Sequence, residues 1–539
     1  MEKRNSETLH ILKERNKLSS RLFFEGLLVG GIAGFIAIIY RLLLTNAESL
    51  YFTIASFVKG NIFYIILWLI GLGILGFIIS LFLKYEPYIS GSGIPQVEAE
   101  VQGQIDQCWY KVLCAKIVAG TLCIVGGLSL GREGPSIQLG AMVGKAVSRF
   151  FKRIKTEERF LLTCGAAAGL SAAFNAPLAG IMFALEEVHK NFSTSALVSV
   201  MCASITGDFL SRNVFGLSPS LHFTMDYALP LYDYGWLLIL GVATGLLGAF
   251  YNKMTMTSLH LYDRISCLKS HQKVIIPLLI SGILGLYIPQ VIGGGHVLVS
   301  YLNSENVVLS TLVILLIVKF IFSLLSFGSG APGGIFFPLL ILGSLIGAIF
   351  GKLAIMLGVP EIYFMNFIIF AMAGFFAGIV RAPITGIVLI AEMCGTLKLM
   401  LPIAAVSFIA YIVANSIGSE PIYESLLHRL TKNKTQTDYV ENKELISFVV
   451  SLGSLAVNQT VASLKLPPRC LLVSIMRGKR EIIPHGDTQF YVGDQVVMIV
   501  DRYRIDEAKE KLAEIFTFHD EMLFFIDFIC KIAYYMNKR

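Results

Sequence analysis

Charged side chains are scarce in this sequence. Only 15% of its 539 residues are Asp, Glu, Lys or Arg, whereas 55% are hydrophobic, and the mean hydropathy is +0.70. Soluble globular domains carry about 25% charged residues, so this composition excludes an ordinary soluble protein. The basic residues also form no stripe interleaved with aromatic side chains, and we therefore expect no nucleic-acid partner. The sequence predicts an all-α polytopic protein whose surroundings are membrane lipid.

The sequence also lacks the spacings that metal sites and hydrolytic enzymes need. Its nine cysteines contain no CxxC pair, and its nine histidines contain no HExxH motif. We interpret the cysteines as small buried hydrophobic residues. A membrane-embedded enzyme is therefore the weakest of the function hypotheses, and we expect neither a cofactor nor a metal, only transported ions.

Apolar stretches recur between residues 24 and 416 and stop after about residue 430. A span of about 30 Å of hydrocarbon needs roughly 17 to 25 residues. The clearest stretches are residues 27–44, 62–83, 274–292 and 309–327. Residues 1–22 are polar for too long to form a secretory signal, so residues 24–44 are predicted to be a retained first span.

Two groups of basic residues indicate how the chain is oriented. One group precedes the first predicted span, and the other lies between residues 145 and 159. Basic residues close to spans favour the cytoplasmic side. We therefore expect residues 1–22 and both termini on the cytosolic side. The net charge of +7 suits contact with an anionic inner leaflet.

An internal repeat divides the apolar region into two halves. The stretch APLAGIMFALE at Ala176 reappears as APITGIVLIAE at Ala382, and GGIAGFIAIIY at Gly30 is similar to GVATGLLGAFY at Gly241. The repeats are predicted to cover about residues 24–210 and 235–420 within a membrane domain of residues 23–430. Transporters built from such repeats bind substrate near the membrane midplane between the halves. An inverted relation is expected because each half contains an odd number of crossings.

Three Gly- and Pro-rich breaks interrupt the apolar runs at residues 91–95, 131–135 and 328–338. Freed backbone groups in a membrane must line a cavity or be buried in protein, so these breaks are predicted to begin half-helices. A helix N-terminus offers unpaired N–H donors and the positive end of a dipole. Partial charges of this kind bind an anion weakly enough to release it. The Ser92 hydroxyl and the N–H groups of Ile335 and Phe336 are candidate donors.

Glu133 is the strongest candidate for a functional side chain, because it stands in the first turn of one of these half-helices. A carboxylate at this position can occupy the anion's place when ionised and leave it when protonated. It would then act as gate and as external proton acceptor. The alternative is a carboxylate that only complements the helix dipole. The neighbouring Arg132 is either its ion-pair partner or an attractor of anions at the pore mouth.

Several stretches resemble the CLC chloride channel and transporter family. GSGIP at Gly91, GREGP at Gly131 and GGIFFP at Gly333 are similar to its three signature motifs, and GAAAGLSAAFNAPLAGI at Gly165 is similar to its core helices. The resemblance covers about residues 20–430. It implies an inverted repeat of broken and tilted helices, and a homodimer in which each subunit has its own pore.

The resemblance also assigns roles to particular residues. It implies that chloride is bound by Ser92, Ile335, Phe336 and the hydroxyl of Tyr423, in the stretch SEPIYESLL. A serine at position 92 is similar to chloride-preferring members. The residues alone give Tyr423 no role beyond packing.

The family contains proton-coupled exchangers and passive channels. Glu187 matches the position at which exchangers keep an internal proton acceptor, so chloride/proton antiport is favoured over a passive voltage- or ligand-gated channel. From the residues alone, Glu186 and Glu187 are equally well explained as solvated charges at a helix end. Lys116 matches a basic residue buried near the pore, but a lysine that reaches a water-filled vestibule is an equal alternative.

Residues 431–539 are predicted to form a linker and a small cytosolic α+β domain. Strands are expected at ELISFVV, CLLVSIM, REIIPHG and QVVMIVD, and helices at ASLKL and DEAKEKLAEIF. The segment resembles the TrkA-C domain, the C-terminal half of RCK domains. That implies a prokaryotic plasma (inner) membrane protein whose tail binds a small ligand, such as a nucleotide, at a dimer interface; the alternative is a tail that only stabilises the dimer.

Overall fold

The structure is a computed structural model. It describes residues 2–190, 194–217, 221, 223, 227, 229–303, 308–432, 443–464, 466–468, 470–477, 480–501 and 505–516, with the backbone alone for residues 2–20. The chain divides into two compact units, Met1–Lys432 and Asn433–Arg539.

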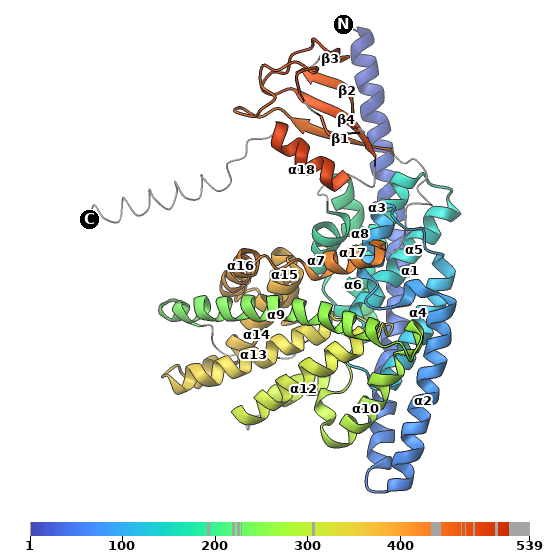
Figure 1. The fold of residues 1–539 in the computed structure, drawn as a ribbon, viewed down its shortest axis with the longest axis vertical. Helices are drawn as coiled ribbons and strands as arrows, with labels where there is room; N and C mark the ends of the chain where they lie inside the picture. Colours follow the sequence, from blue (N-terminus) through green and yellow to red (C-terminus); the bar gives the residue numbers. More distant parts are fainter. Residues whose placement is uncertain are drawn as a thin grey trace, which may run out of the picture. The chain divides into compact units, whose positions relative to one another are not determined.

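The described part of the first unit is helical, and its two halves repeat one order of elements. The first half contains α1 Glu2–Val58, α2 Ile62–Tyr85, α3 Ile94–Gln102, α4 Trp109–Val125, α5 Glu133–Phe150, α6 Lys155–Phe174, α7 Pro177–Phe183 and α8 Thr194–Phe215. The second half contains α9 Gly235–Arg264, α10 Ile275–Tyr287, α11 His296–Leu302, α12 Leu309–Gly328, α13 Phe336–Met356, α14 Phe364–Val380, α15 Pro383–Met393 and α16 Met400–Ser416, and α17 Ile422–Lys432 follows. Figure 1 shows the ribbons of α9, α12 and α13 strongly inclined to those of α1 and α2.

The two halves contact each other through equivalent positions. The backbone N–H of Gly131 donates to the carbonyl of Gly334 at 2.6 Å, and the N–H of Gly334 donates back to the carbonyl of Gly131 at 2.9 Å. Both glycines immediately precede the start of a helix, α5 in one half and α13 in the other. Such reciprocal contacts characterise a two-fold relation. The predicted inverted repeat of broken and tilted helices is confirmed.

The expected span at residues 274–292 is wrong. Helix α10 ends at Tyr287, and Pro289–Val291 forms a short 3-10 turn. The residue before a proline is disfavoured in helical conformation, and Ile288 has φ −135° and ψ 66°. The first predicted span, residues 24–44, lies inside the longer helix α1. The spans predicted at residues 62–83 and 309–327 correspond to α2 and α12.

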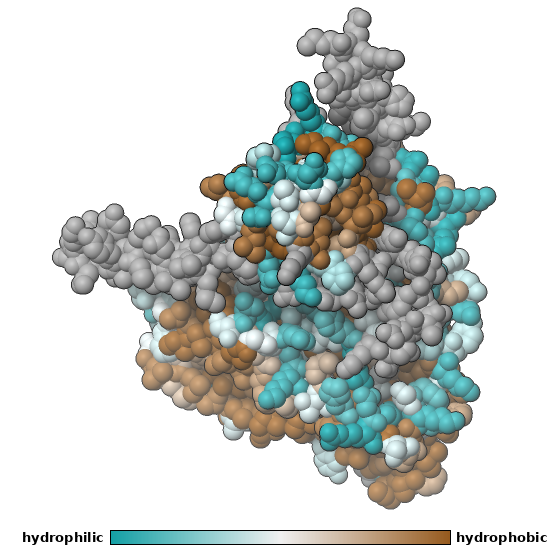
Figure 2. Space-filling view, turned by 45° about the horizontal axis from the view of Figure 1, so that its top comes forward, coloured by the Kyte–Doolittle hydropathy of each residue, from teal (hydrophilic) through white to brown (hydrophobic). Residues whose placement is uncertain are grey.

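Exposed hydrophobic residues on the first unit mark its lipid-facing surface. Six described helices are long and apolar enough to cross a membrane, and only 17% of the most apolar window of α2 is buried. The exposed side chains on α2 include Ile66, Ile70, Ile74 and Phe77. In Figure 2 hydrophobic residues form broad patches on the face shown. Because lipid solvates such surfaces, the first unit is a multi-pass membrane protein.

Glycines hold α5 and α6 in backbone contact. A Cβ atom placed on Gly165 would collide with the carbonyl oxygen of Gly140, and one placed on Gly140 would collide with that of Gly165. Gly144 and Gly169 face the partner helix in the same way. Small residues at a helix interface allow this close approach in membranes. The contact fixes the position of α5, and therefore of Glu133 at its first turn.

The second unit contains a four-stranded antiparallel sheet in the order β1-β4-β2-β3. Its elements are β1 Lys443–Val449, β2 Cys470–Arg477, β3 Arg480–Ile482, β4 Gln495–Asp501 and α18 Ile505–Phe516. Buried residues of the sheet and of α18 share one core. The predicted small α+β domain after the membrane unit is confirmed.

The helix expected at ASLKL is wrong for its described residues. Residues 461–464 form turns, in which the Ser463 hydroxyl accepts the N–H of Thr460 at 3.0 Å and donates to the carbonyl of Thr460 at 2.7 Å. Serine side chains compete in this way with helical hydrogen bonds.

The second unit contains an ion pair between Arg477 and Asp494. The Arg477 guanidinium donates to both carboxylate oxygens of Asp494, at 2.9 and 2.8 Å. Although burial alone would raise the pKa of Asp494, the hydrogen bonds from Arg477 and from the N–H of Tyr491 hold it below its usual range. The pair therefore stays ionised at neutral pH.

We predict that Gly165→Ala destabilises the first unit, because the added methyl group must displace the backbone of α5. Overpacking of this kind costs about 1–3 kcal/mol. The matched control is Gly31→Ala in α1, where an added Cβ would have no atom within 4 Å. Thermal unfolding of the purified protein in detergent should give a lower Tm for Gly165→Ala and an unchanged or higher Tm for Gly31→Ala. Equal Tm values for the two variants would contradict the close contact.

Candidate functional site

The three interrupted segments meet through backbone hydrogen bonds. In addition to the pair between Gly131 and Gly334, the N–H of Gly333 donates to the carbonyl of Gly91 at 3.1 Å, and the N–H of Gly91 donates to that of Gly330 at 3.4 Å. The loops thus satisfy each other's backbone groups where lipid could not. The three predicted breaks, far apart in the sequence, form one junction.

Helices α3, α5 and α13 start at this junction. Helix α3 follows Gly93, whose φ of 95° allows the sharp turn that a residue with a side chain would resist. Helix α5 starts at Glu133 and α13 starts at Phe336. The positive ends of three helix dipoles and their unpaired N–H groups are therefore brought together, which favours an anion.

Two buried hydroxyl groups belong to the same region. Ser92 is buried. It lies so close to Gly134 that a Cβ atom placed on Gly134 would collide with the Ser92 oxygens. Tyr423, in the first turn of α17, is also fully buried. Neither hydroxyl has a hydrogen-bond partner among the described residues. A buried hydroxyl left without a protein partner is costly unless it serves a ligand.

Aromatic rings surround the start of α13. Ile335 and Phe336 are buried, and the ring of Phe336 lies 5.0 Å from that of Phe376 and 6.0 Å from that of Phe183. The Phe183 ring in turn lies 6.4 Å from the ring of Tyr423. The structure thereby brings Tyr423 next to the start of α13, although nothing in its local sequence indicated this.

The Glu133 carboxylate is folded over the junction rather than directed to solvent. Its side chain is 1% exposed, and Oε1 lies 3.8 Å from the Nε of Arg132. Its Oε2 lies beside Gly131 and has no hydrogen-bond partner among the described residues. The carboxylate faces the backbone N–H of Phe337 in the first turn of α13. It therefore occupies a position that suits an anion.

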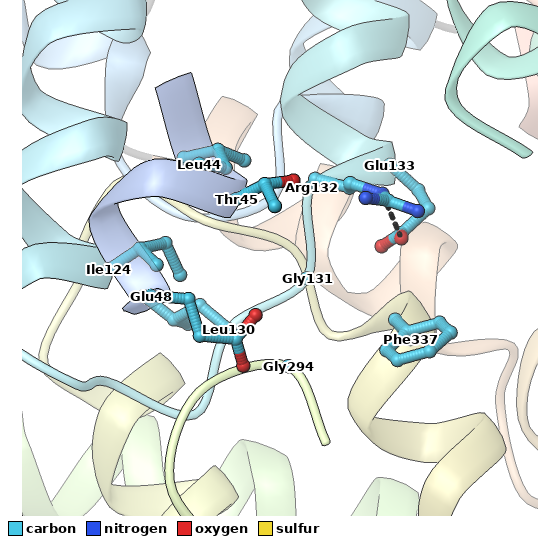
Figure 3. A pocket seen from close by; sticks show the side chains of 10 residues that line it. All are labelled: Leu44, Thr45, Glu48, Ile124, Leu130, Gly131, Arg132, Glu133, Gly294 and Phe337. Atoms are coloured by element: carbon cyan, nitrogen blue, oxygen red, sulfur yellow. Dashed lines mark ion pairs between the residues drawn. The ribbon is translucent and has the colours of Figure 1, made fainter. Parts of the chain in front are cut away.

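A small cavity lies beside this carboxylate (Figure 3). It offers about 30 Å³ to molecules of the size of water. The cavity is lined by Leu44, Thr45, Glu48, Ile124, Leu130, Gly131, Arg132, Glu133, Gly294 and Phe337. Arg132 lines the cavity and lies 3.8 Å from Glu133, as expected of an ion-pair partner; its role at a pore mouth stays a prediction.

Glu187 is buried within a cluster of charged groups. It lies in the turn Ala184–His189 that extends α7, and it is 7% exposed. Glu98, Glu424 and Lys190 lie near enough to interact with it electrostatically. The Lys190 ammonium contacts Glu98 at 2.6 Å. Glu187 is therefore not a freely solvated charge at a helix end.

Glu186 and Glu392 cap helices across the two halves. The Glu186 carboxylate accepts from the N–H and the hydroxyl of Thr385, at 2.8 and 2.7 Å, in the first turn of α15. The Glu392 carboxylate accepts from the N–H groups of Leu178 and Ala179, at 3.0 and 2.8 Å, in the first turn of α7. Each half thus supplies the cap for a helix of the other half.

Two buried lysines hold equivalent loops in the two halves. The Lys116 ammonium donates to the carbonyls of Ile89 and Gly91, at 2.7 and 2.8 Å. The Lys319 ammonium donates to those of Val291 and Gly293, at 2.9 Å each. Both lysines are fully buried. Lys116 therefore holds the loop that carries Ser92 instead of reaching a water-filled vestibule.

Sequence reasoning missed several residues of this region. Aligning the halves beyond the quoted repeat would have found Lys319, because it occupies the position equivalent to Lys116. Glu392 is the last residue of the quoted repeat and the counterpart of Glu186, but its partners in α7 are not evident from the sequence. Nothing in the local sequence marks Glu98 or Lys190, since their proximity to Glu187 arises only in the folded chain.

The chain is similar to known proteins in sequence. Residues 74–415 match the family described as voltage gated chloride channel, and residues 445–513 match the TrkA-C domain. The H(+)/Cl(-) exchange transporter ClcA of Vibrio parahaemolyticus is 37% identical over 434 residues, which cover 77% of this chain and 91% of that protein. The transporter of the same name from Citrobacter koseri is 34% identical over 440 residues, with coverage of 79% and 92%.

The chain is also similar to solved structures. The crystal structure of a slow cyanobacterial Cl−/H+ antiporter has a TM-score of 0.73 and 30% identity, with coverage of 77% of this chain and 99% of that one. A CLC-type fluoride/proton antiporter has a TM-score of 0.63 and 22% identity, with coverage of 75% and 97%. The latter likeness concerns the fold alone.

We predict that Glu392→Ala destabilises the first unit, because it leaves the N–H groups of Leu178 and Ala179 without an acceptor. Loss of a side-chain cap at a helix N-terminus costs about 0.5–2 kcal/mol. The control is Glu361→Ala, since the Glu361 side chain is 73% exposed and its ion pair lies at the surface. In thermal unfolding experiments in detergent, the Tm of Glu392→Ala should lie well below that of the control. A Tm equal to that of the parent protein would rule out a stabilising cap.

Proposed function

This chain belongs to the voltage-gated chloride channel (CLC) family, and on that basis we propose that it exchanges chloride for protons across a membrane. The observation that carries the proposal is the placement of the Glu133 carboxylate at the start of α13, where it faces the Phe337 N–H. Relatives at 37 and 34% identity are named as H+/Cl− exchange transporters. The activity in these names agrees with a site that alternates between a carboxylate and an anion.

Chloride binds, in this proposal, where the helix N-termini and the unpaired hydroxyls converge. The N–H groups of Ile335 and Phe336 and the hydroxyls of Ser92 and Tyr423 are its donors. Four neutral donors stabilise a halide through partial charges, so the ion is held without a buried cation and can leave again. The buried, unpartnered state of the Ser92 and Tyr423 hydroxyls supports these assignments.

Glu133 is the gate and the external proton acceptor. While ionised, its carboxylate lies against the N–H of Phe337, next to the N–H groups of Ile335 and Phe336, and closes the path. Protonation removes the charge that these groups attract, so the side chain leaves and chloride enters. The proton then moves with the side chain, which couples the two ions in opposite directions.

Glu187 is the internal proton acceptor. Its burial among Glu98, Glu424 and Lys190 supports exchange over a passive channel, because a buried cluster of ionisable groups within a membrane is characteristic of a proton path. Tyr423 lies near enough to interact electrostatically with both Glu187 and Glu133. Protons therefore approach the gate from the Glu187 side while chloride follows its own inner route.

The assembly and orientation complete the proposal. The chain forms a homodimer with one pore in each subunit, in a prokaryotic plasma membrane, with both termini in the cytosol. Basic residues near the first span support this orientation. The TrkA-C domain binds a small ligand, such as a nucleotide, and regulates transport.

We predict that Glu133→Gln leaves chloride flux measurable and abolishes proton coupling. Glutamine has the shape of the protonated acid but cannot titrate. Purified protein in liposomes is assayed for chloride release with a chloride electrode and for proton movement with a pH electrode. Glu361→Gln, at an exposed site, is the matched control. If Glu133→Gln strongly reduces chloride flux, and the flux that remains is still coupled to proton movement, the gate assignment is wrong.

We further predict that Glu187→Gln keeps chloride flux but no longer moves protons against a proton gradient. The substitution removes a titratable group with little change in shape. Glu186→Gln should reduce proton pumping less, because Glu186 caps α15. Proton pumping by Glu187→Gln at the parent rate, in the same liposomes, would place the internal acceptor elsewhere.

A further inference from the structure

Glu48 on α1 forms the wall of the gate cavity together with Arg132 and Glu133 (Figure 3). Its side chain is half-buried. The Oε1 atom is buried, lies close to Gly293, and has no hydrogen-bond partner among the described residues. The side chain thus joins the interior of the cavity to the surface of the protein, and it has no role in the mechanism described so far.

Two cations face the Glu48 carboxylate. Arg132, from the loop before α5, and Lys319, from α12, lie near enough to interact with it electrostatically. Arg132 also faces Glu133 at 3.8 Å. The Arg132 guanidinium is paired with Glu133, and its charge also acts on Glu48 from farther away, so a change in the charge of one carboxylate is felt by the other.

The cavity can hold the water that proton transfer needs. Its volume of about 30 Å³ accommodates about two water molecules, and its polar lining supplies hydrogen-bond partners. Thr45, one turn before Glu48 on α1, is exposed and also lines the cavity. Two carboxylates that line one water-filled cavity can exchange a proton through that water.

Glu48 is not needed merely to neutralise Lys319. The Lys319 ammonium bonds to two backbone carbonyls, and its counterpart Lys116 makes the same pair of bonds in the other half. No described carboxylate accompanies Lys116 in its electrostatic surroundings. A buried lysine in this setting is therefore stable without a facing acid.

We propose that Glu48 relays protons between the solution at its side of the membrane and the Glu133 gate, through water in their shared cavity. This inference rests on the proposed exchange function. A hydronium ion in that solution gives its proton to the Glu48 carboxylate and becomes water. The acid then gives a proton to a cavity water, which passes one to Oε2 of Glu133, and Glu48 returns to its ionised form. Release follows the same steps in reverse.

The test compares Glu48→Gln, Glu48→Asp and the parent protein in liposomes. The rate of chloride/proton exchange is measured as a function of the pH of the solution on the side of the membrane that Glu48 faces. Glu48→Gln should slow coupled exchange by about tenfold or more and flatten its dependence on that pH. Glu48→Asp should restore both, because it keeps a titratable group. A parent-like rate and pH profile in Glu48→Gln overturns the relay. Absence of proton movement in the parent overturns the exchange function itself.

A second comparison separates a relay from a structural effect. In a Glu133→Gln background the gate accepts no proton, so adding Glu48→Gln should change the remaining chloride flux by less than about twofold. If the second substitution lowers that flux as strongly as it lowers exchange in the parent, Glu48 acts on the chloride path or on folding, and the relay is overturned.

Discussion

Hydrogen bonding between interrupted segments is the constraint on which the rest of the membrane unit depends. A break in a helix frees N–H and C=O groups that lipid cannot satisfy. Here the loops before α3, α5 and α13 pair with one another through Gly91, Gly131, Gly333 and Gly334. The pairing uses the backbone groups of the loops and leaves the first N–H groups of the helices available. The same bonds therefore stabilise the junction and leave free the donors of the proposed anion site.

Two buried lysines hold equivalent loops in the two halves, and neither is a donor in the proposed anion site. Lys116 and Lys319 each bind two carbonyls of the loops that precede α3 and α11. In the proposed mechanism, full charges serve where binding is permanent, and partial charges serve where an ion must bind and leave. Arg132 combines the two: it carries a full charge, but its partner Glu133 is proposed to gain and lose a proton.

Local sequence predicted the breaks, the place of Glu133 in the first turn of a helix, and most of the second unit. Gly and Pro determine backbone conformation within a few residues, and the strands of the tail have clear apolar patterns. The end of α10 was missed because an apolar run conceals the effect of Pro289. The role of Glu186 and the surroundings of Glu187 were missed for another reason: residues such as Thr385 and Glu98 approach them only after the two halves have packed. Glu48 is an ordinary residue in sequence and becomes notable only beside Arg132.

The reciprocal caps of Glu186 and Glu392 also bear on biogenesis. A ribosome that has completed α1 to α8 has made a half whose α7 amides have no acceptor until Glu392 emerges, more than a hundred residues later. The nascent half must meanwhile keep that terminus hydrated or shielded by the insertion machinery. The two halves thus depend on each other, because each supplies the cap for a helix that begins in the other half.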